Sequence, residues 1–223
     1  MLNDGGSKMQ YKEVAGGICA PKGFAAAGVH CGIRANHSEK YDLALIKAEV
    51  RCAAAGVYTT NKVCGAPIKV DRAHLADGYA QAIVVNSGNA NTCAANGVAL
   101  AEECCALVGK ALNMDEKDVL PASTGVIGQP MVIDPFARGI PAAAEKLAAT
   151  AQGSTDAATA IMTTDTKPKT VELTGSNGWK IGGMVKGSGM IAPQLATMLC
   201  VITTDAVVSA GQMQAALAVA AEH

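Results

Sequence analysis

A threonine near the end of the chain stands where a glycine-rich turn meets an apolar run. Pro193 prevents a continuous helix through the turn, and Thr197 then precedes the apolar residues 198–203. If the bond between Ala196 and Thr197 were cut, Thr197 would gain a free α-amino group with an ordinary pKa of about 7.7–8.0, which accepts a proton near neutral pH. A threonine activated by its own amino terminus is a nucleophile that needs no histidine. Taken alone, the spacing favours a plainer interpretation, a β-branched residue that begins a strand.

A second hydroxyl residue, Thr124, directly precedes Gly125 within the segment 121–128, which predicts a turn after apolar chain. A threonine hydroxyl and the adjacent glycine N–H can point at one oxygen atom, as an oxyanion hole requires. Considered alone, this pair is more typical of an ordinary turn. The polar run 86–91 after the apolar residues 81–85 is either a further site loop or a plain turn, because its asparagines and glycine favour left-handed backbone positions.

The composition indicates a globular chain whose core is built from small and aliphatic side chains. Half of the 223 residues are hydrophobic but 3% are aromatic, and 18 basic residues are balanced by 19 acidic ones. The sequence has no basic stripe that would favour a nucleic-acid partner, and no apolar run is long enough to span a membrane. The polar stretch 1–15 is expected to be a flexible leader, since it lacks the apolar core of a signal peptide.

Neither the cysteines nor the histidines show the spacing of a metal site. The eight cysteines include no C-x-x-C pair, and His30 and His37 flank Cys31 without a further ligand at a suitable spacing. We therefore interpret the cysteines as small buried hydrophobic residues in a reducing cytoplasm. Neither a disulfide nor a bound metal is expected.

The elements that must position these residues alternate between short β-rich runs and alanine-rich helices. This pattern predicts an α/β fold, with mixed sheets covered by helices such as 98–112 and 209–222. Strands are predicted at 42–48, 56–60, 66–70, 81–85 and 198–203, and a hairpin at 170–173 and 179–186. Helices are predicted at 98–112, at 141–150 with Pro141 in its first turn, at 157–162 with a cap at 154–156, and after a Ser209–Gln212 capping box.

Eight stretches of the chain, taken together and in order, carry a resemblance to a known family. They are APKGF at 20–24, YTTNKV at 58–63, VNSGNAN at 85–91, STGVIG at 123–128, AIMTTDT at 160–166, KGSGMIAP at 186–193, ATML at 196–199 and TTDA at 203–206. With these motifs, the chain from about residue 15 to about residue 210 is identified as a member of the ornithine acetyltransferase family. Its members are also called glutamate N-acetyltransferases of arginine biosynthesis.

The resemblance implies an N-terminal-nucleophile enzyme with the fold of that family, whose precursor cuts itself between Ala196 and Thr197. Residues 16–196 would form the α-chain domain, and residues 197–223 would be the start of a β chain. The family's β chain continues well beyond this point and supplies further residues to the substrate pocket. The chain alone is therefore expected not to complete the ornithine site.

The resemblance also assigns roles to five residues. Thr197 matches the nucleophile that takes the acetyl group, and it also contacts the substrate. Thr124 and Gly125 match the oxyanion-hole pair. Thr163 and Lys186 match positions that contact the substrate amino acid.

The activity implied by the resemblance is transfer of an acetyl group from N-acetylornithine to glutamate, in the cytoplasm, without a cofactor. Acetyl-CoA as a second donor is left open. The implied assembly is a heterotetramer of two α and two β chains, without nucleic acid or membrane partners. Two alternatives stay open, namely a hydrolase or aminopeptidase with the same kind of nucleophile, and a catalytically incomplete fragment.

Overall fold

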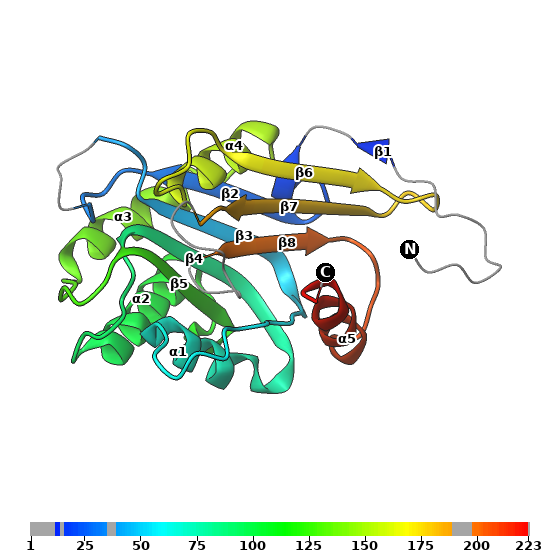
Figure 1. Ribbon diagram of the computed structural model, residues 1–223. Helices are drawn as coiled ribbons and strands as arrows, with labels where there is room; N and C mark the ends of the chain where they lie inside the picture. The colour runs from blue at the N-terminus through cyan, green and yellow to red at the C-terminus, as the bar shows by residue number, and fades with distance from the viewer. Residues whose placement is uncertain (1–11, 14–15, 35–38, 189–197, 223) are drawn as a thin grey trace.

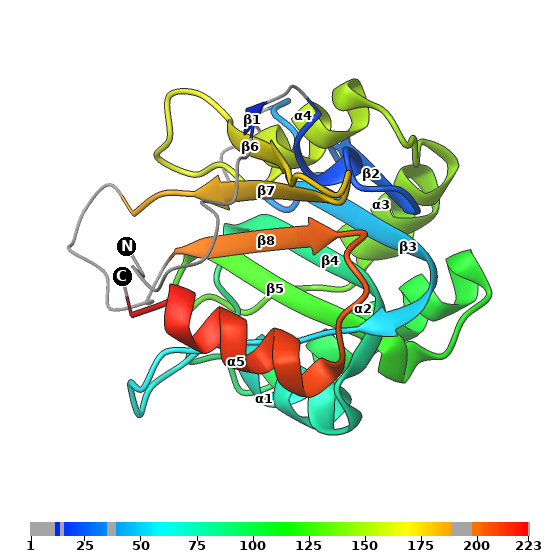
Figure 2. The ribbon, with the colours of Figure 1, turned by 90° about the vertical axis from the view of Figure 1, so that its right-hand side faces the viewer.

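Two four-stranded sheets pack against each other in the computed structural model, which describes residues 12–13, 16–34, 39–188 and 198–222 (Figures 1 and 2). The first sheet is antiparallel and has the order β1 (Lys12–Glu13), β6 (Lys169–Thr174), β7 (Lys180–Lys186), β8 (Leu199–Thr204). The second sheet has the order β2 (Phe24–Val29), β3 (Leu43–Ala53), β4 (Tyr79–Asn89), β5 (Val119–Val126). In the second sheet β4 and β5 are parallel, and the other pairs are antiparallel.

Five α-helices accompany the strands in the described part of the chain. They are α1 (Ala66–His74), α2 (Gly97–Leu112), α3 (Asp134–Glu145), α4 (Ala151–Ala160) and α5 (Ala210–Ala220). Three short 3-10 helices accompany them, η1 (Gly17–Cys19), η2 (Leu75–Asp77) and η3 (Glu116–Asp118). None of the helices described here is both long enough and apolar enough to cross a membrane.

The second sheet is buried on both faces, as the alternation along β3 shows. Leu43 and Leu45 belong to a core shared with α1, α2 and α3. Ala44 and Ile46 belong to a second core, which β3 shares with α4, β7 and β8. Because successive side chains of a strand point to opposite faces, one strand serves both cores. The second core lies between the two sheets.

The parallel pair of β4 and β5 places polar residues from two parts of the chain side by side. Parallel neighbours need a crossover, and α2 lies in the connection between these strands. The pairing aligns Ser87 with Thr124 and Gly88 with Gly125. Both strands thus run toward the same edge of the sheet, where the hydroxyl and glycine residues of the two strands meet.

The structure contradicts the prediction of strands at 56–60 and 66–70. Residues 66–70 open α1, with Pro67 in the first turn and Gly65 before it in an extended conformation. A proline at this position loses no helical hydrogen bond, because the first N–H groups of a helix have no partner within it. Pro67 and Val70 are three residues apart and both buried, a helical spacing that the β-branched residues of this segment obscured. Residues 56–60 form no strand.

Two helix boundaries also differ from the prediction. Helix α3 begins at Asp134 with Pro135 in its first turn, so Pro141 lies inside this helix. Helix α4 begins after Thr150, whose Oγ1 accepts a hydrogen bond from the Gly153 N–H at 3.1 Å, and the cap predicted at 154–156 is wrong. In both cases an earlier proline or hydroxyl residue supplies the start signal that was assigned to a later one.

Other predictions are confirmed. Helix α2 lies at the predicted position, β6 and β7 form the hairpin, and β8 covers the predicted strand within one residue. Ser209 and Gln212 form the capping box of α5. None of the residues of α5 is buried, however, so this helix does not cover a sheet in the way that α2 does.

The cysteines are less uniformly buried than predicted. All eight have free thiols, Cys104 and Cys105 are buried in α2, and Cys93 and Cys200 are exposed. Burial raises the pKa of the Cys104 thiol to about 12, which keeps this thiol protonated and unreactive near neutral pH.

Asp71 of α1 makes the stability of the fold depend on pH. Burial raises the pKa of its carboxyl from the ordinary 3.8 to about 8, and its Oδ1 has no hydrogen-bond partner among the described residues. Between about pH 4 and pH 8 the unfolded chain releases this proton while the folded chain keeps it, so stability falls as the pH rises. Asp71→Asn removes that titration.

We expect the thermal midpoint of the wild type to fall between about pH 5 and pH 8 by roughly 5 °C more than that of Asp71→Asn. Calorimetry across this range measures the difference. Asp77→Asn is the control, because the hydrogen bond from Arg51 lowers the pKa of Asp77 and its contribution is lost only as the pH falls. Parallel wild-type and Asp71→Asn curves would show that Asp71 is ionised in the folded chain.

Candidate functional site

Thr124 and Gly125 lie inside strand β5, and the turn predicted for 121–128 begins only after Val126. The strand continues through this pair because both residues keep their alignment with β4, Thr124 with Ser87 and Gly125 with Gly88. A hydroxyl residue before a glycine suggests a turn when only neighbouring residues are considered. Here pairing with a parallel neighbour keeps both residues within the strand.

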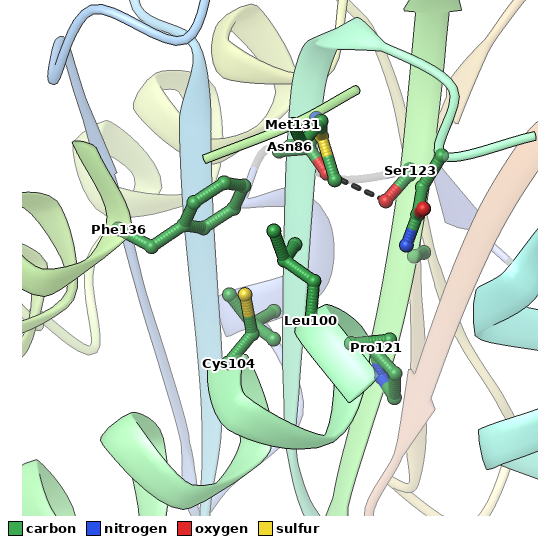
Figure 3. Close-up of a pocket in the computed structure, with 11 residues that line it drawn as sticks. Asn86, Leu100, Cys104, Pro121, Ser123, Met131 and Phe136 are labelled. Atoms are coloured by element: carbon green, nitrogen blue, oxygen red, sulfur yellow. Dashed lines mark hydrogen bonds between the residues drawn. The ribbon is translucent and has the colours of Figure 1, made fainter. Parts of the chain in front are cut away.

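The alternation of side chains along β5 decides which way Thr124 faces. Ser123 faces the helical side of the sheet, where its Oγ donates to Asn86 Oδ1 at 2.6 Å in a small pocket lined by Leu100 and Phe136 (Figure 3). Thr124 therefore faces the opposite side, toward the first sheet. It is 5% exposed.

Lys186, the last residue of β7, meets Thr124 between the two sheets. Its Nζ donates a hydrogen bond to Thr124 Oγ1 at 3.2 Å, and the residue is 3% exposed. Burial lowers the pKa of the Lys186 ammonium, the nearby Asp165 carboxylate opposes this shift, and Lys169 adds to it. Because an ammonium can only donate, Thr124 Oγ1 is the acceptor in this contact, and its own proton stays available for another oxygen.

Thr163 follows α4 and is linked to the end of β7 through Asp165. The Thr163 N–H donates to Asp165 Oδ2 at 3.4 Å, and the Gly187 N–H donates to Asp165 Oδ1 at 2.9 Å. Lys169 Nζ also donates to Oδ1. Thr163 itself is half-buried. The structure thus connects Thr124, Lys186 and Thr163 although they are far apart in the sequence.

Gly125 occupies a backbone position that only glycine fits. Its φ is +132°, and a Cβ there would lie 2.3 Å from the Gly88 carbonyl carbon and 2.6 Å from the Asn89 nitrogen. Gly125 is exposed, whereas the neighbouring Thr124 is buried. The absence of a side chain lets β4 and β5 approach closely here.

Ala196 and Thr197 lie outside the described residues. The described chain resumes at residue 198, and Leu199 of β8 is aligned with Lys186 of β7. The site predicted from sequence is therefore represented by Thr124, Gly125, Thr163 and Lys186. Their catalytic and substrate-binding roles stay predictions.

Two residues that the sequence did not single out tie the site together. Arg34 Nη2 donates to Ser87 Oγ at 2.7 Å and to the Met162 carbonyl oxygen at 2.6 Å, so it joins the end of β4 to the turn that carries Thr163. The backbone before Arg34 is held by Asp42, whose carboxylate accepts the N–H groups of residues 31–33 at 2.7–3.0 Å. Asp42 is fully buried. The sequence signal that could have identified Asp42 is its position as a charged residue directly before an apolar strand.

Asp165 was also not singled out from the sequence, although it lies in the AIMTTDT stretch at 160–166. The sequence signal that could have identified Asp165 is an acidic residue in a polar turn, four positions before Lys169. Among the described residues, no group of three or more histidine, cysteine or acidic side chains is arranged to hold a metal ion.

Two solved structures with a similar fold define the class of protein. An ornithine acetyltransferase complexed with ornithine, from Mycobacterium tuberculosis, superposes with a TM-score of 0.78 at 38% identity, over 82% of this chain and 98% of that one. An arginine biosynthesis bifunctional protein from Bacillus halodurans superposes with a TM-score of 0.78 at 36% identity, over 86% of this chain and 100% of that one. The resemblance inferred from sequence and the α/β fold are therefore confirmed.

Residues 25–223 match the ArgJ family, and the chain belongs to it. The arginine biosynthesis bifunctional protein ArgJ of Bifidobacterium longum is 60% identical over 208 residues, which are 91% of this chain and 52% of that protein. The protein of the same name from Symbiobacterium thermophilum is 48% identical over 209 residues, 92% of this chain and 51% of that protein. The chain spans about half the length of these curated relatives.

Proposed function

We propose that this chain takes part in arginine biosynthesis by moving an acetyl group from N-acetylornithine to glutamate through an acetyl-threonine intermediate at Thr197. The observation that carries the proposal is the hydrogen bond from Lys186 Nζ to Thr124 Oγ1 at 3.2 Å. It orients Thr124 as an acceptor toward Lys186, so the hydroxyl proton is left to bind a substrate oxygen. Membership of the ArgJ family supports the same reaction.

In the first half-reaction the Thr197 hydroxyl attacks the acetyl carbonyl carbon of N-acetylornithine. The α-amino group of Thr197 takes the hydroxyl proton, and the Thr124 hydroxyl and the Gly125 N–H stabilise the negative oxygen that forms. Collapse of this intermediate breaks the C–N bond, and the leaving nitrogen of ornithine takes up the proton. The acetyl group stays on Thr197 as an ester.

In the second half-reaction the amino group of glutamate attacks the ester carbonyl. The same two donors stabilise the second negative oxygen, and Thr197 leaves with its proton restored, giving N-acetylglutamate. Both substrates are amino acids with a carboxylate. A lysine such as Lys186 gives charge-assisted hydrogen bonds to a carboxylate. Thr163 is assigned to the same substrate, and its backbone is linked through Asp165 to Gly187, the residue after Lys186.

The nucleophile requires self-cleavage between Ala196 and Thr197, which we include in the proposal. One observation supports it. The solved chain from Mycobacterium tuberculosis is covered to 98% by this chain, whereas the curated relatives are covered to about half, so the solved chain is a much shorter polypeptide than they are.

The experiment measures cleavage and transfer separately. Mass spectrometry of the purified protein shows whether the chain is whole or split after Ala196. Transfer is assayed with N-acetylornithine and glutamate, for this chain alone and for the chain mixed with the remaining half of the Bifidobacterium longum relative. Acetylglutamate formed only in the mixture would identify the chain as a catalytically incomplete fragment, and free acetate without acetylglutamate would identify a hydrolase and overturn the proposal.

Two further parts of the proposal have their own tests. Acetyl-CoA replaces N-acetylornithine in a parallel assay, and acetylglutamate formed there would add a second donor. The native mass of the cleaved protein tests the heterotetramer of two α and two β chains. Fractionation of the producing cells tests the cytoplasmic location.

The role of Thr124 predicts a large loss of turnover in Thr124→Val. Valine keeps the shape of this buried side chain but has no hydroxyl, and removing one donor from an oxyanion hole typically lowers turnover by about 10²–10³-fold. We expect KM for N-acetylornithine to change little, because the hydroxyl acts on the charge that forms during reaction. Thr124→Ser is the matched control and should retain most activity. Equal activity of the wild type and Thr124→Val would exclude Thr124 from the oxyanion hole.

A further inference from the structure

One carboxylate, that of Asp165, connects the segments that carry Thr163 and Lys186. Its Oδ1 accepts from the Gly187 N–H at 2.9 Å and from Lys169 Nζ, and its Oδ2 accepts from the Thr163 N–H at 3.4 Å. The Asp165 side chain is 3% exposed. Three donors from the end of α4, the start of β6 and the end of β7 therefore converge on one buried side chain.

The backbone of β7 approaches this carboxylate closely. A Cβ at Gly187 would lie 3.1 Å from Asp165 Oδ1 and 3.6 Å from Lys169 Nζ. Gly187 directly follows Lys186, so a contact that fixes Gly187 also fixes the backbone from which the Lys186 side chain extends toward Thr124. An asparagine offers one acceptor oxygen and one donor group, and it cannot accept from both sides as the carboxylate does.

We propose that Asp165 is a positioning residue for acetyl transfer, which holds the Thr163 backbone and the Lys186–Gly187 end of β7 at a fixed spacing beside Thr124. The inference rests on the proposed function, since Thr163 and Lys186 are the residues assigned to the substrate. Asp165 acts through these neighbours. Its effect on the reaction comes from the geometry that it maintains and from its charge.

The charge of Asp165 acts on Lys186 in a direction that can be measured. Among the described residues, the charges of Asp165 and Lys169 act on Lys186, and Thr124 Oγ1 accepts a hydrogen bond from its ammonium. Burial lowers the pKa of Lys186, Asp165 opposes this shift, and Lys169 adds to it. Removing the carboxylate therefore lowers the pKa of Lys186 further, whereas removing Lys169 raises it.

The test compares Asp165→Asn with Lys169→Met, because the two variants change the charge beside Lys186 in opposite directions. We expect the pKa of Lys186, followed by NMR of isotope-labelled lysine in this chain, to fall in Asp165→Asn and to rise in Lys169→Met, by about half a unit or more in each case. Hydrogen exchange at the Gly187 and Thr163 amides should become at least about tenfold faster in Asp165→Asn. In Lys169→Met both amides keep their acceptor and should exchange nearly as in the wild type.

In the preparation that transfers acetyl, Asp165→Asn should lower kcat by about 10–100-fold, since small displacements of positioning groups cost this much. The alkaline limb of its pH profile should shift to lower pH, and that of Lys169→Met to higher pH. A residue with a merely structural role would lower the amount of folded enzyme and leave the profile in place. If Asp165→Asn does not fold, the upward shift of the Lys186 pKa in Lys169→Met still tests whether neighbouring charges act on Lys186.

Unchanged exchange at both amides together with an unchanged Lys186 titration in Asp165→Asn would overturn the inference. Shifts of the Lys186 pKa in the same direction in Asp165→Asn and Lys169→Met would also overturn it. The NMR and exchange measurements need no acetyl transfer. If these shifts occur and the wild type transfers no acetyl group, the proposed function fails while the positioning geometry stands.

Discussion

A Thr197→Val protein is expected to remain one uncut polypeptide and to transfer no acetyl group. Self-cleavage requires the Thr197 hydroxyl to attack the Ala196 carbonyl carbon, which gives an ester that water then hydrolyses. Valine keeps the β-branched shape and removes the hydroxyl, so both the cut and the later acetyl ester become impossible. The loss of turnover should be complete, while the thermal midpoint should stay close to that of the wild type.

Thr197→Ser is the matched variant that keeps the nucleophile. Serine lacks the γ-methyl that restricts rotation about χ1, so its hydroxyl is held less firmly in position. We expect Thr197→Ser to cleave more slowly and to retain part of the transferase activity. A denaturing gel and the N-acetylornithine assay measure both properties, in this chain alone and in its mixture with the remaining half of a relative. A Thr197→Val protein that still splits or still turns over would place the chemistry on another residue.

Gly125→Ala is expected to cost both stability and activity, because an alanine Cβ would overlap the backbone of β4. It would lie 2.3 Å from the Gly88 carbonyl carbon and 2.6 Å from the Gly88 oxygen, neither of which belongs to a flexible side chain. The φ of +132° adds strain for any L-residue. Overpacking and left-handed strain together are expected to lower the free energy of unfolding by about 2–5 kcal/mol. Since Thr124 precedes this residue, the Lys186–Thr124 contact should be displaced as well.

Gly128→Ala separates the two causes. Gly128 also has a positive φ, +79°, but a Cβ there would meet nothing within 4 Å. It should therefore lose only the strain of about 1–2 kcal/mol and keep most of its activity. Denaturant unfolding and the transfer assay of both variants make the comparison. If Gly125→Ala loses no more stability than Gly128→Ala, β4 can move away from β5, and the close approach is not required.

Where neighbouring residues along the chain determine a structure, the sequence was sufficient to predict it. The apolar spacing of residues 98–112 predicts α2, the Ser209–Gln212 capping box predicts the start of α5, and the hairpin of β6 and β7 follows from its turn. These features depend on contacts between residues a few positions apart, which propensity and periodicity describe. The ordered motifs predicted the family for the same reason, since a motif is read directly from the chain.

Contacts between distant residues decided the rest. Residues 66–70 form a helix because Pro67 and Val70 are buried on one face of α1, and packing of this kind outweighs the strand preference of a short β-branched run. Thr124 lies in a strand because β4, more than thirty residues earlier in the chain, pairs with it. A pattern in one sequence has no information about the residues that pack against α1 or about the strand that pairs with β5.

The chain by itself determined which residue types are available for acyl transfer, namely hydroxyl residues beside glycines and a lysine before a glycine-rich turn. The tertiary structure alone decided that Lys186 meets Thr124 across two sheets and that Asp165 joins Thr163 to Gly187. The physical reason is that hydrogen bonds act over about 3 Å. Such a distance between residues many positions apart exists only once the two sheets have packed and the strand register has set which side chains face each other.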